Sequence, residues 1–335
     1  MITEVTFKNY RAIEDATLEL GPLTLLVGPN GSGKTSALDA FRYFRGTLPD
    51  ISELQSVGGL ERSVEFIFKF MCGNAVVQRS LVAGPNRVNS QQLIVNGQPH
   101  NGSQLVLAEA ARIANGLRYY AFDASKMREP VTITQYRELK EDGSNLAGFL
   151  DYIRDNGSDG FEGLKRALHR SAPEYDDIGF DGFGNGQKIF KLRRTGSRSF
   201  VPARFLSEGT LYVVALLAML YQPDLPALLC IEEPDRGLHP RLYRAIRDTL
   251  YRLAYPHDFD EKRLPVQIIA TTHSPYFLNE FTDRPEQVVI CEKGADHRVT
   301  FRNLGKDPEA RRILDDAMIG DAWATGALGG VPAHA

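Results

Sequence analysis

The chain has 335 residues, of which 43% are apolar and 24% are charged, and its formal net charge is −3. These values are ordinary for a globular protein with one large or two small domains. The charge balance excludes an overall basic field that would attract nucleic acid, although a local basic groove is compatible with it. The pattern has no signal peptide and no apolar run of about 18 residues, so we expect a cytoplasmic chain that does not span a membrane.

The three cysteines, Cys72, Cys230 and Cys291, are far apart in the sequence and lack metal-ligand spacing. We therefore expect reduced thiols, with Cys230 and Cys291 inside buried strands.

The N-terminal region predicts strands, a glycine-rich turn and a helix, in that order. Residues 2–7 and 16–20 are expected to be strands, with a turn between them. Residues 23–27 form a continuous apolar run, which is typical of a strand buried on both faces. After the turn, apolar residues between Ala37 and Phe44 fall on one helical face.

The middle of the chain has a different pattern. Apolar runs at 64–70, 75–82 and 93–95, separated by Gly, Pro and Asn, predict a small antiparallel sheet. Between Leu146 and Ile153 the apolar residues form a helical stripe, and Gly157 is a plausible end of that helix. Residues 171–186 are rich in Gly, Asp and Pro and predict a loop.

After Arg204 strands and helices alternate. Helices are expected at 210–220 and 242–253, and strands at 227–231, 266–270, 288–291 and 299–301. Such alternation predicts an α/β fold with a parallel sheet covered on both faces. We divide the chain into a nucleotide-binding core (1–60 and 201–335), an antiparallel β subdomain (61–100) and a helical or mixed insert (101–200).

The strongest motif follows the predicted buried strand and matches G-x-x-x-x-G-K-[ST]. Its glycines let backbone N–H groups converge on phosphates, Lys34 is expected to reach the β- and γ-phosphates, and the Thr35 hydroxyl is expected to bind Mg²⁺. A chance glycine turn is the alternative, at roughly one chain in a hundred of this length. The predicted ATP-binding residues here are Gly28, Pro29, Asn30, Gly31, Ser32, Gly33, Lys34, Thr35 and Ser36.

Two adjacent carboxylates end the predicted strand at 227–231. Neighbouring residues at a strand end point in different directions, so the two can have different roles. Glu232 is predicted to bind Mg²⁺ and Glu233 to polarise the attacking water. A helix start that favours acidic residues is the alternative interpretation.

Two further motifs have structural alternatives. Ser207 is a natural helix N-cap and Gly209 allows close backbone approach, which suits either a second anion site or simply a well-capped helix. His273 follows a predicted strand at the sheet edge where ligands bind, and it could sense the γ-phosphate, although a lone histidine is more often structural.

These four motifs, in this order, resemble those of ABC-type ATPases of the soluble branch that includes RecF, SMC and OLD-type proteins, with the greatest likeness to small bacterial ATPases classed as AAA. The resemblance is weak from about 60 to 120 and from 155 to 200. It rests on the following segments: Phe7–Arg11, Asp142–Leu146, Leu206–Thr210, Glu232–Pro240, Thr272–Pro275 and Trp323–Gly330.

The resemblance implies an ABC-type ATPase head whose cofactors are ATP and Mg²⁺. Two heads would form a homodimer around two ATP molecules. Ser207 and Gly209 of one chain would contact the γ-phosphate held by the other, and Asp235 would link the two sites. Hydrolysis, with Lys34, Glu233 and His273 as catalytic residues, would open the dimer.

The sequence departs from the family pattern at three points. Glu232 stands where many relatives have Asp, and no segment identifies itself as a Q-loop, for which Gln78 and Gln135 are the candidates. No aromatic residue identifies itself as a stacking partner for adenine, and the candidates for contact with the base are Tyr10 and Arg11.

Three biological roles remain open at this point. A DNA-associated ATPase for repair or for defence against phage or plasmids is suggested by the resemblance and by a basic stretch, which is also compatible with a solvated strand face. A regulatory ATPase that controls a separately encoded nuclease or toxin is the second, and a transporter subunit is disfavoured by the signature motif. The absence of heptads argues against a long coiled-coil arm. The basic stretch comprises Lys188, Lys191, Arg193, Arg194, Arg198 and Arg204.

Overall fold

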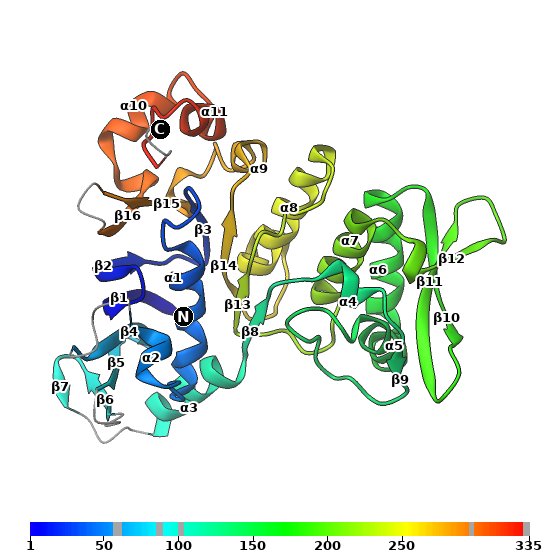
Figure 1. The fold of residues 1–335 in the computed structure, drawn as a ribbon, viewed down its shortest axis with the longest axis horizontal. Coiled ribbons are helices and arrows are strands. Elements are labelled where there is room, and N and C mark those ends of the chain that lie inside the picture. The colour runs from blue at the N-terminus through cyan, green and yellow to red at the C-terminus, as the bar shows by residue number, and fades with distance from the viewer. Residues whose placement is uncertain (56–61, 85–89, 100–103, 295–297, 331–335) are drawn as a thin grey trace. The chain divides into compact units, whose positions relative to one another are not determined.

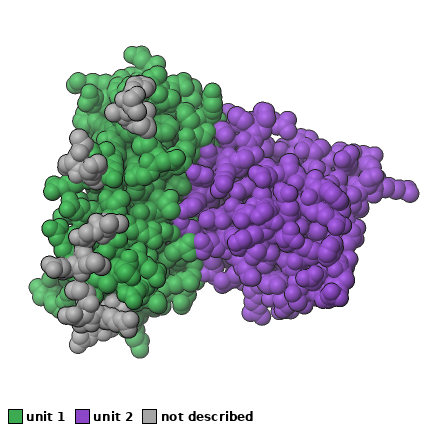
Figure 2. All heavy atoms as spheres, viewed as in Figure 1, with its two compact units in different colours: residues 1–117, 227–230, 254–335 green, residues 118–226, 231–253 purple. Residues whose placement is uncertain are grey.

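The computed structural model describes residues 1–55, 62–84, 90–99, 104–294 and 298–330. The chain forms two compact units, which Figure 2 colours separately: unit 1 (1–117, 227–230 and 254–335) and unit 2 (118–226 and 231–253). The predicted boundaries at 60/61 and 100/101 lie outside the described residues, and the three-part division stays a proposal. Among the described residues, no helix is long and apolar enough to cross a bilayer.

An antiparallel sheet forms one part of unit 1, with the strand order β2-β1-β4-β5-β6-β7 (Figure 1). Burial along β4 alternates, as the sequence predicted, so that Phe66, Phe68 and Phe70 all face the core. The two N-terminal strands, which we had placed with the nucleotide-binding core, pair into this same sheet. Its strands are β1 (Ile2–Tyr10), β2 (Ile13–Glu19), β4 (Val64–Cys72), β5 (Ala75–Ala83), β6 (Ser90–Val95) and β7 (Gln98–Pro99).

The second sheet of unit 1 contains, in order, β16-β15-β3-β14-β13. Strand β3 pairs in parallel with β14 and β15, while β16 is antiparallel to β15. Every residue of β3 and β14 is buried, which explains the continuous apolar runs. The mostly parallel α/β core is thus confirmed. The strands are β3 (Leu23–Val27), β13 (Leu228–Ile231), β14 (Gln267–Thr272), β15 (Val288–Lys293) and β16 (Val299–Asn303).

Short helices complete unit 1. The helix predicted after the glycine turn is divided into an α-helix, α1, and a 3-10 helix, η1, which carries Phe41 and Phe44 onto Phe68 at ring-centroid distances of 6.0 and 5.2 Å. The helices are α1 (Lys34–Ala40), η1 (Phe41–Arg45), α2 (Ile51–Leu54), α3 (Gln104–Asn115), η4 (Pro256–Phe259), α9 (Pro275–Asn279), η5 (Pro285–Gln287), η6 (Leu304–Lys306), α10 (Pro308–Leu314) and α11 (Ile319–Ala324).

Unit 2 combines helices with a small sheet in which β10, β11 and β12 are neighbours and β9 pairs with β11. Strand β8 leads from unit 1 into unit 2, and α8 leads back. The elements are β8 (Leu117–Tyr120), α4 (Ala124–Met127), β9 (Val131–Thr132), α5 (Leu146–Asn156), α6 (Ser158–Ser171), β10 (Tyr175–Gly182), β11 (Gln187–Arg194), β12 (Phe200–Pro202), η2 (Ala203–Phe205), α7 (Glu208–Leu220), η3 (Pro240–Leu242) and α8 (Tyr243–Ala254).

The loop predicted at 171–186 is wrong. Residues Tyr175–Gly182 form strand β10, which pairs antiparallel with β11. This strand lies at the end of the sheet and fully buries only Ile178. An edge strand tolerates Asp and Gly because one side of its backbone is not part of the ladder, so composition misled the prediction.

The segment Asp142–Leu146 forms the turn that begins α5. Asp142 accepts a hydrogen bond from the Ser144 N–H at 3.0 Å and pairs with Lys126 at 2.9 Å. Although burial acts in the opposite direction, these contacts lower the pKa of Asp142 to about 2. Buried Asn145 closes the turn through the Lys140 N–H and the Glu138 carbonyl. The segment therefore has a structural role in unit 2.

All three cysteines are free and buried, as the sequence predicted. Burial raises the pKa of Cys291 to about 12 and also raises that of Cys230. Both thiols therefore stay protonated and unreactive at neutral pH.

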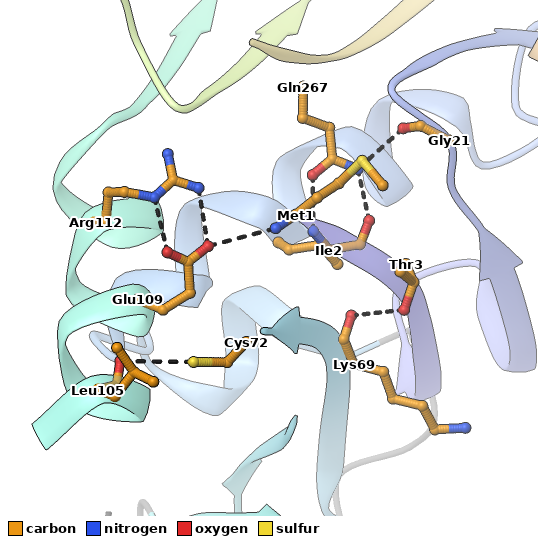
Figure 3. A network of polar contacts seen from close by, with 10 residues as sticks. All are labelled: Met1, Ile2, Thr3, Gly21, Lys69, Cys72, Leu105, Glu109, Arg112 and Gln267. Carbon is orange, nitrogen blue, oxygen red and sulfur yellow. Dashed lines mark hydrogen bonds and ion pairs between the residues drawn. The ribbon is translucent and has the colours of Figure 1, made fainter. Parts of the chain in front are cut away.

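One buried carboxamide joins the two sheets of unit 1 at the start of β14 (Figure 3). The Gln267 Oε1 accepts from the Ile2 N–H at 2.8 Å, and its Nε2 donates to the carbonyls of Ile2 at 2.6 Å and Gly21 at 3.1 Å. Only 4% of Gln267 is exposed, so these backbone groups depend on it rather than on water.

Replacing this carboxamide should destabilise the protein. Gln267→Leu keeps the approximate shape but leaves up to three buried backbone groups without their partner, so we expect a loss of about 2–4 kcal/mol in the free energy of unfolding, measured by urea denaturation. The control is Gln222→Leu, which removes one half-exposed bond to the Met219 carbonyl and should cost under about 1 kcal/mol. Equal losses in the two variants would contradict the role of Gln267.

Candidate functional site

The glycine-rich turn Gly28–Gly33 connects β3 to α1, as the motif predicted. A Cβ at Gly28 would lie 2.2 Å from the Cys291 carbonyl oxygen, so only glycine fits there. Gly31 and Gly33 have φ values of 78° and 91°, in the left-handed region that glycine adopts without strain. The turn is therefore shaped by backbone constraints, and a glycine turn of this kind can present backbone N–H groups to an anion.

Lys34 lies folded back over this turn. Its Nζ donates to the carbonyls of Gly28 at 2.9 Å and Pro29 at 2.8 Å, and only 4% of the residue is exposed. An ammonium group held at the mouth of a glycine turn can transfer its hydrogen bonds to a phosphate oxygen that enters the turn. Thr35 is exposed beside it, with its hydroxyl available to an ion.

His273 reaches the same edge of the sheet through strand register. Thr272, the last residue of β14, pairs with Val27, the last residue of β3, so that His273 and Gly28 follow at corresponding positions. Ser274 then caps α9 by accepting from the Phe277 N–H at 3.2 Å. Within unit 1 the structure thus brings together the glycine turn and His273.

Glu232 follows β13 and is held by strand β8. Its N–H donates to the Tyr120 carbonyl at 2.8 Å, and its Oε1 accepts from the Tyr119 hydroxyl at 2.6 Å. Tyr119 is only 7% exposed while Glu232 is half-buried, so this bond is partly shielded from water. Tyr119 was not among the predicted site residues, because it is one of several aromatic residues in an apolar strand and no motif marks it.

Glu233 has an unusual backbone conformation. Its φ of 44° lies in the left-handed region, which costs a non-glycine residue on the order of 1–2 kcal/mol. Strain of this kind is concentrated at functional sites, where it directs a side chain. Glu232 does not share this positive φ, and Asp235, only 7% exposed, follows the two carboxylates.

The segment Leu206–Thr210 packs against the segment Glu232–Pro240. Ser207 caps α7 by accepting from the Thr210 N–H at 3.1 Å. A Cβ at Gly209 would lie 2.6 Å from the Gly237 carbonyl oxygen. The close backbone approach that Gly209 permits is therefore to Gly237 of the same unit. Unit 2 therefore brings together Ser207, Gly209 and the segment Glu232–Pro240, which we call the acidic segment.

The two residues predicted to contact the nucleotide base, Tyr10 and Arg11, differ in burial and in their contacts. Tyr10 is fully buried and has no face open to a base, so that prediction is wrong. Arg11 donates to Asp39 on α1 at 2.6 Å and stacks over Tyr10, which gives it a structural role, and its contact with ATP stays a prediction. Neither Gln78 in β5 nor exposed Gln135 lies in a setting that identifies a Q-loop.

The basic stretch is largely used inside unit 2. Lys188 pairs with Asp151, Lys191 with Asp181, and Arg193 with both Asp176 and Asp177. These pairs join β11 to β10 and α5 and favour the structural interpretation of half of the stretch. The exposed members are Arg194, Arg198 and Arg204.

A family model described as "AAA domain, putative AbiEii toxin, Type IV TA system" matches residues 23–279. The chain is 25% identical, over 92% of its own length, to an OLD nuclease from Thermus scotoductus, and spans 65% of that protein. It is also 35% identical over 99 residues to the DNA replication and repair protein RecF of Erwinia tasmaniensis, which is 27% of that protein.

Two solved structures share the fold. An Smc head bound to the C-terminal winged-helix domain of ScpA has a TM-score of 0.62 at 14% identity and matches 90% of this chain and 96% of its own. A second Smc head domain, with an extended coiled coil, is bound to the C-terminal domain of ScpA from Pyrococcus furiosus. Its TM-score is 0.59 at 14% identity, and the match covers 94% of this chain and 98% of that one.

The family match covers both the glycine turn of unit 1 and the acidic segment of unit 2. The geometry at Gly28, the strained Glu233 and the shared Smc head fold agree with that match. The chain belongs to this AAA-domain family, within the ABC-type ATPases of the RecF, SMC and OLD branch.

Proposed function

We propose that the chain binds ATP with Mg²⁺ and hydrolyses it to ADP and phosphate. The observation that carries this proposal is the turn at Gly28, where a buried lysine occupies the mouth of a backbone cradle that excludes any side chain. Gly28–Ser36 bind the phosphates, Lys34 neutralises charge on the γ-phosphate, Glu233 orients the attacking water, and His273 contacts the γ-phosphate.

Oxygen donors suit Mg²⁺, which is commonly held by one or two protein groups together with phosphate oxygens and water. The exposed Thr35 hydroxyl and the Glu232 carboxylate supply such donors. The ion would neutralise charge that develops on the phosphates. Tyr119 limits the directions that the Glu232 carboxylate can take, because it is bonded to one of its oxygens.

We further propose that ATP closes a head-to-head homodimer. Ser207 caps a helix whose first turn is partly exposed, and Asp235 lies in the acidic segment against which that turn packs. In the dimer Ser207 and Gly209 would meet the γ-phosphate held by the second copy. ATP would then favour the closed state and hydrolysis would release it.

For the biological role we propose DNA repair, as the name of the RecF relative suggests, or defence against phage or plasmids. The alternative is a regulatory ATPase that controls a separately encoded nuclease or toxin without itself binding DNA. The ion pairs of Lys188, Lys191 and Arg193 favour this alternative, because they remove half of the basic stretch from any DNA surface.

The catalytic proposal is tested by two substitutions. Lys34→Ala should weaken ATP binding about tenfold or more, because a charge-assisted hydrogen bond is worth roughly 1.5–3 kcal/mol.

Glu233→Gln should keep ATP binding, lower hydrolysis about 100-fold or more, and trap a dimer seen by light scattering. Matched controls are Lys8→Ala, which removes an ion-paired surface lysine, and Glu174→Gln at an exposed position. Equal hydrolysis by wild type and Glu233→Gln would refute the role of Glu233.

The substitution Tyr119→Phe tests whether the Tyr119 hydroxyl orients the Glu232 carboxylate. Without the 2.6 Å hydrogen bond, the carboxylate is less restricted, so we expect the Mg²⁺ concentration for half-maximal activity to rise about threefold to tenfold. ATP binding without Mg²⁺ should not change. Tyr212→Phe is the control, because it removes a buried tyrosine bond to the Phe122 carbonyl in the same unit. A Mg²⁺ profile unaltered by Tyr119→Phe would show that Tyr119 is only a packing residue.

Charge reversal of exposed arginines tests whether DNA binds to the basic stretch. In the DNA-associated version, Arg194→Glu with Arg198→Glu should lower the affinity for a short DNA duplex about tenfold and reduce its salt dependence, because two phosphate contacts are lost. Arg241→Glu, at an exposed position elsewhere in unit 2, is the control. Unchanged stimulation of ATPase activity by DNA in the double variant would exclude this patch as the DNA site, whereas no binding or stimulation by DNA in the wild type would support the regulatory alternative.

A further inference from the structure

Unit 1 contains a cavity of ≈ 560 Å³ that the proposed ATPase mechanism does not use. Its walls are mainly apolar and come from segments that are distant in the sequence. The principal apolar residues are Pro22, Ala227, Ala254, Pro256, Leu264 and Val266. A volume of this size, with mostly apolar walls and a few polar groups, is typical of small-molecule sites.

The cavity lies at the opposite end of the parallel strands from the glycine turn. Pro22 directly precedes β3, Ala227 precedes β13, and Gln267 opens β14. The turn at Gly28 follows the other end of β3, five residues away, or roughly 17 Å at about 3.3 Å per residue. The cavity is therefore distinct from the phosphate-binding turn.

Two polar residues of the lining, Glu109 and Arg112, come from α3 (Figure 3). Arg112 donates to Glu109 through Nε at 2.8 Å and through Nη2 at 2.9 Å, and this pairing holds the pKa of Glu109 below its usual value. These two bonds use two of the five N–H groups of a guanidinium, and the Arg112 side chain is 39% exposed. Arg112 can therefore still donate to an acceptor in the cavity.

The remaining polar groups restrict the ligand further. The Gln267 carboxamide is hydrogen-bonded to backbone groups of Ile2 and Gly21, so it forms part of the cavity wall and is not a hydrogen-bonding partner for the ligand. Charges of both signs line the cavity, since Glu109 and Asp258 accompany Arg112. The Met1 ammonium also lines the cavity, 3.5 Å from Glu109, so cations and anions balance. A charged ligand therefore gains no net attraction that would offset the loss of its hydration, whereas an uncharged ligand has little hydration to lose.

We propose that this cavity binds a compact, uncharged and mainly apolar small molecule that carries a hydrogen-bond acceptor such as a carbonyl group. The apolar body packs against the proline and aliphatic walls, and the acceptor faces Arg112. The site stands independently of the proposed ATPase activity.

The test uses acedan, an uncharged naphthalene ketone, in equilibrium dialysis against the full chain with and without ADP. We expect one saturable site whose affinity ADP does not change. Leu264→Trp should weaken binding about tenfold or more, because the larger ring fills the cavity, and Arg112→Met about threefold to tenfold, because the acceptor loses its donor.

The matched control is Leu105→Trp. Leu264 and Leu105 are 71% and 69% exposed, so neither substitution disturbs the core, and only Leu264 lines the cavity. Leu105→Trp should bind acedan like wild type. The proposal is overturned by no saturable binding to wild type, by equal binding to the two tryptophan variants, or by competition with ADP.

Discussion

The parallel pairing of β3 with β14 is the constraint on which the candidate site depends. Both strands are buried on both faces, and their register brings Thr272 beside Val27. Because both strands end at one edge, the residues that follow, Gly28 and His273, leave the sheet together. The neighbouring strand β15 then brings the Cys291 carbonyl so close to Gly28 that no side chain fits. The backbone cradle is thus a consequence of how a dry sheet is packed.

Local signals in the sequence predicted much of this arrangement. The apolar run at 23–27 coincides with β3, and Ser207 caps α7 at the expected position. Such features were predictable because an apolar run or an N-cap acts over a few residues. Strand β10 was not, because its Asp and Gly residues are typical of a loop, and Tyr119 was not, because it depends on a partner distant in the sequence. The edge strand needs β11, and Tyr119 becomes important only when β8 brings it to Glu232.

Runs of charged residues in the sequence indicated functional residues less reliably than backbone strain in the structure did. Lys188, Lys191 and Arg193 resemble a nucleic-acid patch along the chain, yet each is paired with an aspartate in unit 2. Glu233, by contrast, adopts a positive φ without being glycine. An ion pair lowers the energy of the fold, whereas this conformation raises it. A cost of that kind needs another reason to persist, and we propose that orientation of the Glu233 carboxylate is that reason.

The cavity in unit 1 raises the question of whether an occupant could influence ATP. It lies where β3, β13 and β14 begin, and the same strands lead to Gly28, Glu232 and His273 along the chain. Continuity alone does not couple two sites, because a ligand shifts an equilibrium only by its difference in affinity for two states. The Gln267 carboxamide is the element through which such a difference could arise, since it borders the cavity and fixes the start of β14 to β1. If its bonds persist in every nucleotide state, a ligand in the cavity stabilises unit 1 without altering hydrolysis. Because ADP is expected to leave the affinity of the cavity ligand unchanged, the ligand in turn leaves the affinity for ADP unchanged.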